Sequence, residues 1–176
     1  MFVTSNENKW REAQAILGRP LERVALELPE LQAPRTREVA LEKAKAAYAL
    51  LKRPVIVEDA GLELHALGGF PGPFIKYWEK LGGLASICRA ADGLPSRAVE
   101  AVCALVAIDG AAVHAVEGRC LGTVSDAPRG TTGFGWDAVF IPEGETRTWA
   151  ELTQAEKDAK SHRRRAWEQL SARLGG

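Results

Sequence analysis

Residues 54–61 of the chain read PVIVEDAG, an apolar, β-branched run that ends in two adjacent carboxylates. The apolar run predicts a buried strand over residues 54–58. We expect Glu58 and Asp59 to lie where this strand ends, because open α/β sheets bind ligands beyond the carboxyl ends of their strands. Buried carboxylates need a cation, and Mg²⁺ prefers one or two of them together with phosphates and water. The alternative is a strand-end turn with solvated acids, and this segment alone leaves both open.

Upstream of this strand, strand patterns alternate with helix patterns. Apolar residues at helical spacing predict one helix over residues 7–18, capped by Asn6, and another over residues 36–52, capped by Thr36. Strands are expected over residues 1–4 and 21–28. Such βα units indicate an α/β fold.

Downstream, Asp109-Gly110 between two apolar runs is a strong hairpin signal. It predicts antiparallel strands and therefore a mixed sheet, within a single domain over residues 1–176. The elements expected here are a helical turn over residues 61–67, a helical stretch over 75–91 broken at Gly82-Gly83, hairpin strands over 97–108 and 111–119, a strand over 136–141, and a final helix to about residue 174 capped by Ser161.

The composition indicates a globular protein. Of 176 residues, 46% are hydrophobic and 26% charged, and the formal net charge is zero, so neither nucleic acid nor an anionic membrane is favoured as a partner. The N-terminal residues lack the pattern of a signal peptide, and no apolar run approaches the roughly 18 residues of a membrane span. The three cysteines are widely spaced, which favours reduced thiols and a cytoplasmic location.

Three further segments could contact an anionic ligand. Residues 4–9 read TSNENK at a helix start, where phosphates bind, although ordinary N-capping explains them equally well. Residues 133–137 read GFGWD, a loop whose aromatic rings suit stacking on a base, although core packing is the commoner use of such rings. Residues 161–165 read SHRRR, which places cations in a helix's first turn, where they oppose the helix dipole.

Taken in order, these segments resemble the inosine triphosphate pyrophosphatase family. The matching stretches run from residue 3 to about residue 167 and read TSNENK, LPELQ, VEDAGL, LGGFPGPFIK, FGWDAVFIP, TWAELT and EKDAKSHR. The resemblance implies an elongated mixed β-sheet flanked by helices, with two lobes around a central cleft, and usually a homodimer. It also implies hydrolysis of non-standard purine nucleoside triphosphates (ITP, dITP or XTP) to the monophosphate and pyrophosphate.

The resemblance also implies roles for single residues. Phosphate contacts fall on Thr4, Ser5, Asn6, Glu7, Asn8, Lys9, Lys43 and Lys76. Glu30 and Asp59 are expected to hold Mg²⁺, with Asp59 also orienting or deprotonating the attacking water and Glu58 supporting it. The base site comprises Phe134 as the stacking ring, together with Gly135, Trp136, Asp137, Lys157, His162 and Arg163. Ala60 also belongs to the substrate site but departs from the family's usual Thr or Ser, which removes a hydroxyl contact.

Three other functions compete with this one. A Maf-like pyrophosphatase acting on pyrimidine or methylated nucleotides is disfavoured by the FGWD and SHR stretches. A nucleotide-binding protein without hydrolysis is suggested by Ala60 alone. A nucleic-acid-binding module is disfavoured by the neutral charge and the lack of a basic stripe.

Overall fold

The computed structural model describes residues 1–110 and 112–175. The predicted start of the second hairpin strand, Ala111, and the last residue of the predicted domain, Gly176, lie outside them. The strands are β1 (Phe2–Val3), β2 (Arg23–Val24), β3 (Val55–Leu64), β4 (Pro71–Gly72), β5 (Ala98–Ile108), β6 (Val113–Val124) and β7 (Phe140–Pro142). The helices are α1 (Glu7–Leu17), α2 (Thr36–Leu51), α3 (Ile75–Gly82), α4 (Leu84–Asp92), α5 (Gln154–Lys160) and α6 (His162–Leu174), with 3₁₀ turns η1 (His65–Leu67), η2 (Gly135–Val139) and η3 (Trp149–Glu151).

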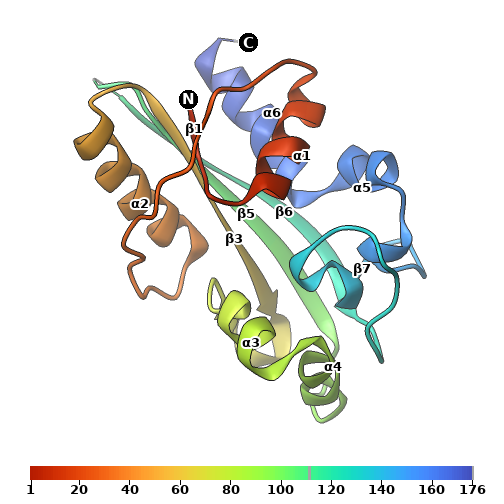
Figure 1. The fold of residues 1–176 in the computed structure, drawn as a ribbon. Helices are drawn as coiled ribbons and strands as arrows, with labels where there is room; N and C mark the ends of the chain where they lie inside the picture. Colours follow the sequence, from red (N-terminus) through yellow and green to blue (C-terminus); the bar gives the residue numbers. More distant parts are fainter. Residues whose placement is uncertain (111, 176) are drawn as a thin grey trace.

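The described residues form a seven-stranded mixed sheet (Figure 1). Its order is β2-β1-β3-β5-β6-β7, and β4 pairs with β3 alone. β1 is parallel to β2 and β3, whereas the other pairings are antiparallel. The predicted α/β fold with a mixed sheet is therefore confirmed. Among the described residues, no helix is both long and apolar enough to cross a membrane.

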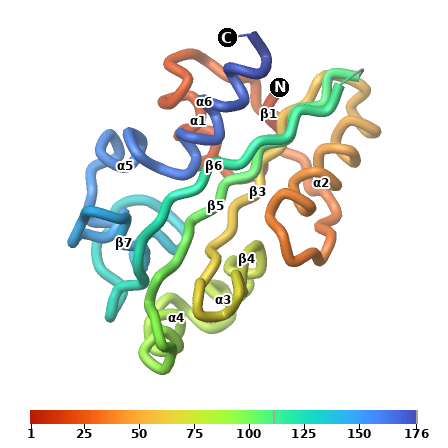
Figure 2. Tube along the Cα trace, turned by 180° about the vertical axis from the view of Figure 1, so that it is seen from behind, coloured from red at the N-terminus to blue at the C-terminus, as the bar shows by residue number. Residues whose placement is uncertain are grey.

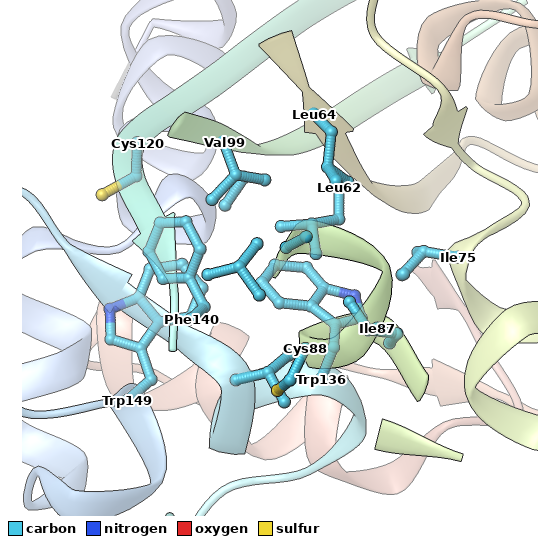
Figure 3. Packing of buried hydrophobic residues seen from close by; sticks show 14 of the residues in the cluster. Leu62, Leu64, Ile75, Ile87, Cys88, Val99, Cys120, Trp136, Phe140 and Trp149 are labelled. Carbon is cyan, nitrogen blue, oxygen red and sulfur yellow. The ribbon is translucent and has the colours of Figure 1, made fainter. Parts of the chain in front are cut away.

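Three long strands, β3, β5 and β6, run the length of the molecule and connect two lobes (Figure 2). In one lobe, α6 and α1 pack on one face of the sheet, and α2 packs on the other. In the other lobe, α3, α4 and the residues around β7 bury an aromatic and aliphatic core that includes Leu62, Trp136 and Phe140 (Figure 3). Both lobes use the same strands at different places along their length, since the second lobe packs on Leu62 and Val99 and the first on Val57 and Leu105.

β3 is longer than its apolar pattern predicts. The strand was expected to end at residue 58, but it pairs with β5 without a break from Val55 to Leu64. The predicted helical turn over residues 61–67 is therefore wrong for its first half, and only His65–Leu67 forms a 3₁₀ turn. Continuous pairing with a long neighbouring strand outweighs the local signal of Ala60 and Gly61.

Four other features of the fold differ from the predictions made from the sequence. The strand expected over residues 136–141 is a 3₁₀ turn over most of its length and becomes β7 only at Phe140. The strand expected over residues 21–28 shrinks to β2. Thr36 does not cap α2, because the cap residue is Arg35 and the Thr36 hydroxyl is buried without a partner among the described residues. α5 was not predicted, although Thr153 and Glu156 form a capping box at its start.

Several local predictions are confirmed. Asn6 and Ser161 cap α1 and α6, the helical stretch breaks at Gly82-Gly83, and β5 and β6 form the predicted hairpin. α6 lies directly on this hairpin, since a Cβ on Gly118 would come within 2.0 Å of the His162 carbonyl oxygen. The absence of a side chain at Gly118 thus allows the start of α6 to approach the sheet closely.

Candidate active site

A cleft lies beside a stretch of β3 that has no strand partner on one side. β1 pairs with β3 only at Ile56 and Val57, and β4 pairs with it only at Leu62 and Glu63. Between these two short strands, residues 58–61 form a free edge within the described part of the sheet. A cleft of about 250 Å³ opens against this edge.

Most of the residues predicted for the site line this cleft. They are Thr4, Ser5, Asn6, Lys9, Glu30, Lys43, Asp59, Ala60, Lys76, Phe134, Gly135, Trp136, Asp137, His162 and Arg163, and Glu58 lines it too. Glu7, Asn8 and Lys157 do not. Glu7 and Asn8 are exposed on the outside of α1, whereas Lys157 is buried behind the cleft wall.

Glu58 and Asp59 do not lie at a strand end, as the sequence predicted, but in the middle of β3. As consecutive strand residues they point to opposite faces of the sheet. Glu58 meets Arg163 of α6, and Asp59 meets Lys43 of α2. Both side chains still line one cleft, because no strand covers this edge of β3.

One end of the cleft is a cluster of acids and lysines. The Lys43 Nζ donates to Glu30 Oε1 at 3.0 Å and to Asp59 Oδ1 at 3.2 Å. Lys76 forms an ion pair with the other carboxylate oxygen of Glu30. Burial raises the pKa of Asp59, and the charges of Lys43 and Lys9 only partly oppose this rise. The acids and lysines thus neutralise one another at this end.

Glu30 and Asp59 fit a divalent ion that the substrate helps to hold. Both carboxylates reach the same Lys43 ammonium, so a cation at that place lies within reach of both. Mg²⁺ commonly takes one or two carboxylates and completes its shell with water and phosphate oxygens. Within residues 1–110 and 112–175, no group of three or more His, Cys, Asp or Glu side chains could hold a metal. An ion at this place would complete its shell with water or with phosphate oxygens.

α1 brings its N-terminus to the same end of the cleft. Asn6 Oδ1 accepts hydrogen bonds from the backbone N–H groups of Asn8 at 3.0 Å and Lys9 at 3.2 Å. Since these first-turn donors are satisfied, attraction of an anion depends mainly on the helix dipole and the Lys9 ammonium. That ammonium lies 3.4 Å from Glu58 Oε1.

The other end of the cleft holds the aromatic loop. The Phe134 N–H donates to Asp137 Oδ2 at 2.8 Å, which closes the turn over residues 134–137. Gly133 has a φ of +73°, and a Cβ there would lie 2.2 Å from that carboxylate oxygen, so only glycine fits. The half-buried Phe134 ring has the Lys157 ammonium 4.8 Å and the Arg163 guanidinium 5.5 Å from its centre.

Trp136 and His162 belong mainly to the aromatic core beneath this loop. Trp136 is 8% exposed and packs against Phe140 and Trp149 (Figure 3). The His162 ring stacks on Trp149 with a centroid distance of 4.9 Å. Burial and the neighbouring cations hold the pKa of His162 well below 6.5, so the ring is neutral. Neither ring nitrogen, both of them buried, has a hydrogen-bond partner among the described residues.

Arg163 is buried beside His162 and bonded on two sides. Its Nε and Nη2 donate to the Glu58 carboxylate at 3.0 and 2.9 Å, and its Nη1 donates to Glu12. A guanidinium carries five N–H donors, so two remain for a ligand. The cleft therefore offers a neutral imidazole and an incompletely bonded guanidinium next to an aromatic ring.

Comparisons with known proteins agree over almost the entire chain. A family model described as the Ham1 family matches residues 1–173. Inosine triphosphate pyrophosphatase 2 of Trypanosoma cruzi is 41% identical over 175 residues, which cover 97% of this chain and 89% of the relative. The chain belongs to the Ham1 family. The dITP/XTP pyrophosphatase of Saccharolobus solfataricus is 38% identical over 168 residues, which cover 94% of this chain and 88% of the relative.

Solved Ham1-family structures share the fold. A HAM1 protein from Coxiella burnetii is similar with a TM-score of 0.84 and 28% identity, covering 99% of this chain and 96% of that one. The nucleoside-triphosphatase / dITP/XTP pyrophosphatase from Mycobacterium abscessus gives a TM-score of 0.75 and 31% identity, covering 97% and 98%. The mixed sheet and helices of this Ham1 chain are thus found in related proteins of known structure.

Glu12 of α1 is a buried part of this Ham1 site that the sequence patterns did not predict. It is 4% exposed, and it accepts hydrogen bonds from Lys157 at 2.7 Å and from Arg163. Burial alone would raise the pKa of Glu12, but the two cations lower it to about 2. Lys157 and Arg163 were both predicted for the base site. Since buried cations need acidic partners, these two residues were a sign in the sequence that a further acid lay nearby. Other lining residues without a prediction are Val3, Leu26, Glu27, Leu28, Ile75 and Glu79.

Replacing Glu12 by glutamine should destabilise this Ham1 chain by about 3 kcal/mol at pH 7, because Lys157 and Arg163 lose a shared buried anion. The folded-state pKa of Glu12 lies below its ordinary value of 4.5, so its contribution is present above pH 4.5 and is lost as the pH falls toward about 2. Urea unfolding at pH 7 and pH 3 measures this loss. Glu7→Gln, at an exposed ion pair, is the control and should cost less than about 1 kcal/mol. If Glu12→Gln lowered the free energy of unfolding by the same amount at both pH values, this would contradict the role of Glu12 as a buried anion.

Proposed function

We propose that this chain hydrolyses ITP, dITP and XTP to the nucleoside monophosphate and pyrophosphate. Relatives named inosine triphosphate pyrophosphatase or dITP/XTP pyrophosphatase are 41% and 38% identical to it over most of their length. The observation that carries the proposal is a single cleft with an acid–lysine cluster at one end and the Phe134 ring with polar groups at the other. The acid–lysine end suits a triphosphate, and the end with the Phe134 ring suits an oxo-purine base.

At the phosphate end, three lysines neutralise the triphosphate. Lys9, Lys43 and Lys76 line the cleft, and each is paired with a carboxylate. An incoming phosphate offers these ammonium groups stronger, doubly charged partners. Substrate binding is therefore an exchange of ion pairs rather than the burial of new unpaired charge.

Mg²⁺ is part of the proposal, with Glu30 and Asp59 as its protein ligands. When bound, the ion supplies Lewis-acid polarisation and charge neutralisation on phosphate oxygens. With that ion bound, Glu30 and Asp59 would no longer need Lys43 as their cation, and Lys43 would be free to pair with the substrate.

Asp59 orients the attacking water and takes its proton. Water adds to the α-phosphorus, the bond from that phosphorus to the bridging oxygen of the β-phosphate breaks, and pyrophosphate leaves with that oxygen. The Asp59 carboxylate lines the cleft beside the acid–lysine cluster, which places it within reach of a water near the phosphates. Ala60 offers no hydroxyl here, so its contribution is limited to the backbone and a methyl group.

At the base end, polar groups select a 6-oxo purine. Arg163 can donate to the 6-oxo oxygen, and the neutral His162 ring can accept from the adjacent N1–H. Adenine presents an amino donor and an unprotonated ring nitrogen at these positions, which would leave both protein groups unpaired. Each unpaired buried group costs about 1–3 kcal/mol, which is the expected basis of discrimination against ATP.

Asp59→Asn should lower kcat for ITP at least about 100-fold and change KM far less, because the substitution removes the base while the phosphate-binding lysines and the aromatic loop remain. Pyrophosphate release from ITP, XTP, ATP and UTP, with Mg²⁺ and with chelator, is the measurement. Asp126→Asn, at a side chain that is 91% exposed, is the matched control and should leave the rates unchanged. Binding of ITP without pyrophosphate release by the wild type, or release from UTP at the rate of ITP, would contradict the proposed function.

We further propose that the chain is located in the cytoplasm and forms a homodimer. The cysteines Cys88, Cys103 and Cys120 are all free, as expected in a reducing compartment.

The large apolar side chains Leu67, Phe70 and Leu121 are 38%, 56% and 44% exposed. Leu67 and Phe70 lie between β3 and β4 in the chain, Leu121 lies on β6, and a second copy of the chain would cover them.

Phe70→Glu should therefore convert a dimer into a monomer in sedimentation equilibrium, because it places a charge within an apolar contact. Val113→Glu, at the hairpin tip, changes a side chain that is equally exposed at 55% and should leave the dimer intact. A wild-type chain that sediments as a monomer at all concentrations would contradict the dimer.

A further inference from the structure

β6 has a long edge that no described strand covers. The strand has 12 residues, and only the last three, from Gly122 to Val124, pair with β7. Along residues 113–121, no other described strand pairs with the side of β6 that faces away from β5. An open edge of this length presents backbone groups to which a strand of another molecule can bind, and proteins commonly protect such edges.

Side chains of α6 cover the carbonyl groups of this edge. Three of them, spaced four residues apart, donate hydrogen bonds to every second carbonyl oxygen of β6. The donors and acceptors are Arg165 Nη1 and the Arg119 oxygen at 2.7 Å, Gln169 Nε2 and the Glu117 oxygen at 2.9 Å, and Arg173 Nη1 and the Ala115 oxygen at 3.1 Å. We call these three hydrogen bonds the α6 ladder. The next carbonyl on this side, that of Leu121, accepts from the Glu143 N–H at 2.9 Å.

The spacing of the α6 ladder follows from the geometry of the helix and the strand. Residues four apart in a helix are separated by about 6 Å along its axis. Carbonyl groups on one side of a strand recur at every second residue, or about 6.8 Å. α6 runs antiparallel to β6, and Gly118 lets it lie close to the strand. Successive turns of the helix therefore meet successive outward carbonyls.

The α6 ladder lies at the surface, and this limits its effect on stability. All three hydrogen bonds are exposed, so bonds to water can replace them, and each contributes about 1 kcal/mol or less. A strand that paired with this edge would lie about 4.8 Å from β6 and would donate to the same carbonyl oxygens. The ladder side chains occupy those acceptors and the space beside them.

We propose that the α6 ladder closes the edge of β6 against pairing with the same edge of a second copy of this chain, and thereby confines self-association to other surfaces. Two copies related by a two-fold axis could otherwise join their β6 strands antiparallel, which is the commonest symmetry of protein dimers. None of the three ladder side chains lines the cleft, so hydrolysis does not depend on the ladder.

The test removes the ladder and measures the mass of the protein in solution. Arg165→Ala/Gln169→Ala/Arg173→Ala should form assemblies of at least about twice the wild-type mass in sedimentation velocity, because two β6 edges can then pair. Arg165→Lys/Arg173→Lys keeps a donor at each position and should retain the wild-type mass. Arg37→Ala/Arg89→Ala is the matched control, since it removes the same charge from exposed positions of α2 and α4 and should also retain that mass.

Amide hydrogen exchange locates the new contact. The N–H groups of Ala115, Glu117 and Arg119 point to the same side as their carbonyls. They should exchange at least about tenfold more slowly in the assembled alanine variant than in the wild type, because pairing gives them acceptors.

Three results would overturn the proposal. The first is an alanine variant with wild-type circular dichroism and wild-type mass, or one that assembles without protection of these N–H groups. The second is assembly of the lysine variant to the same degree as the alanine variant. The third is binding of a synthetic peptide of residues 113–119 to the wild type in calorimetry, a measurement that does not depend on the folding of any variant.

Discussion

The site depends on one feature of the sheet, the free edge of β3 at residues 58–61. β3 is paired with β5 along its entire length, but on its other side β1 and β4 are too short to meet. The gap leaves a rigid strand, held by ten paired residues, with one open edge in the middle of the molecule. Acids on opposite faces of this strand can therefore reach a common cleft, which a strand covered on both edges would not allow. Pairing with β5 fixes the positions of these acids, and the gap between β1 and β4 gives a ligand access to them.

The ion pairs around this edge fall into two groups that differ in burial. Glu58 and Arg163 form a fully buried pair that Glu12 extends to Lys157 and Asp137, which fixes α1, α5, α6 and the aromatic loop relative to β3. The pairs of Lys43 and Lys76 are less buried. An ion pair that keeps contact with water costs less to break than a buried one. The buried pairs thus maintain the structure, whereas the accessible pairs are suited to opening for the substrate.

Local signals in the sequence located most of the site but not its architecture. The hairpin at Asp109-Gly110 and the caps at Asn6 and Ser161 are encoded by adjacent residues, so pattern alone predicts them. The extent of β3 is decided by pairing with a strand some forty residues away along the chain, which a window of neighbouring residues cannot report. Glu12 resembles any acid of an amphipathic helix, because its partners Lys157 and Arg163 are 145 and 151 residues away. The resemblance to the family predicted a role for each of these residues, and the fold shows how residues far apart in the sequence come together.

A structure with Mg²⁺ and an inosine triphosphate analogue that resists cleavage between its α- and β-phosphates would test the central claim most directly. The account predicts the triphosphate against the free edge of β3, the ion on Glu30 and Asp59, Lys43 turned from these acids to phosphate oxygens, and the base on Phe134. A nucleotide bound elsewhere, or one bound in the cleft with Lys43 still joined to Asp59 and Glu30, would contradict it.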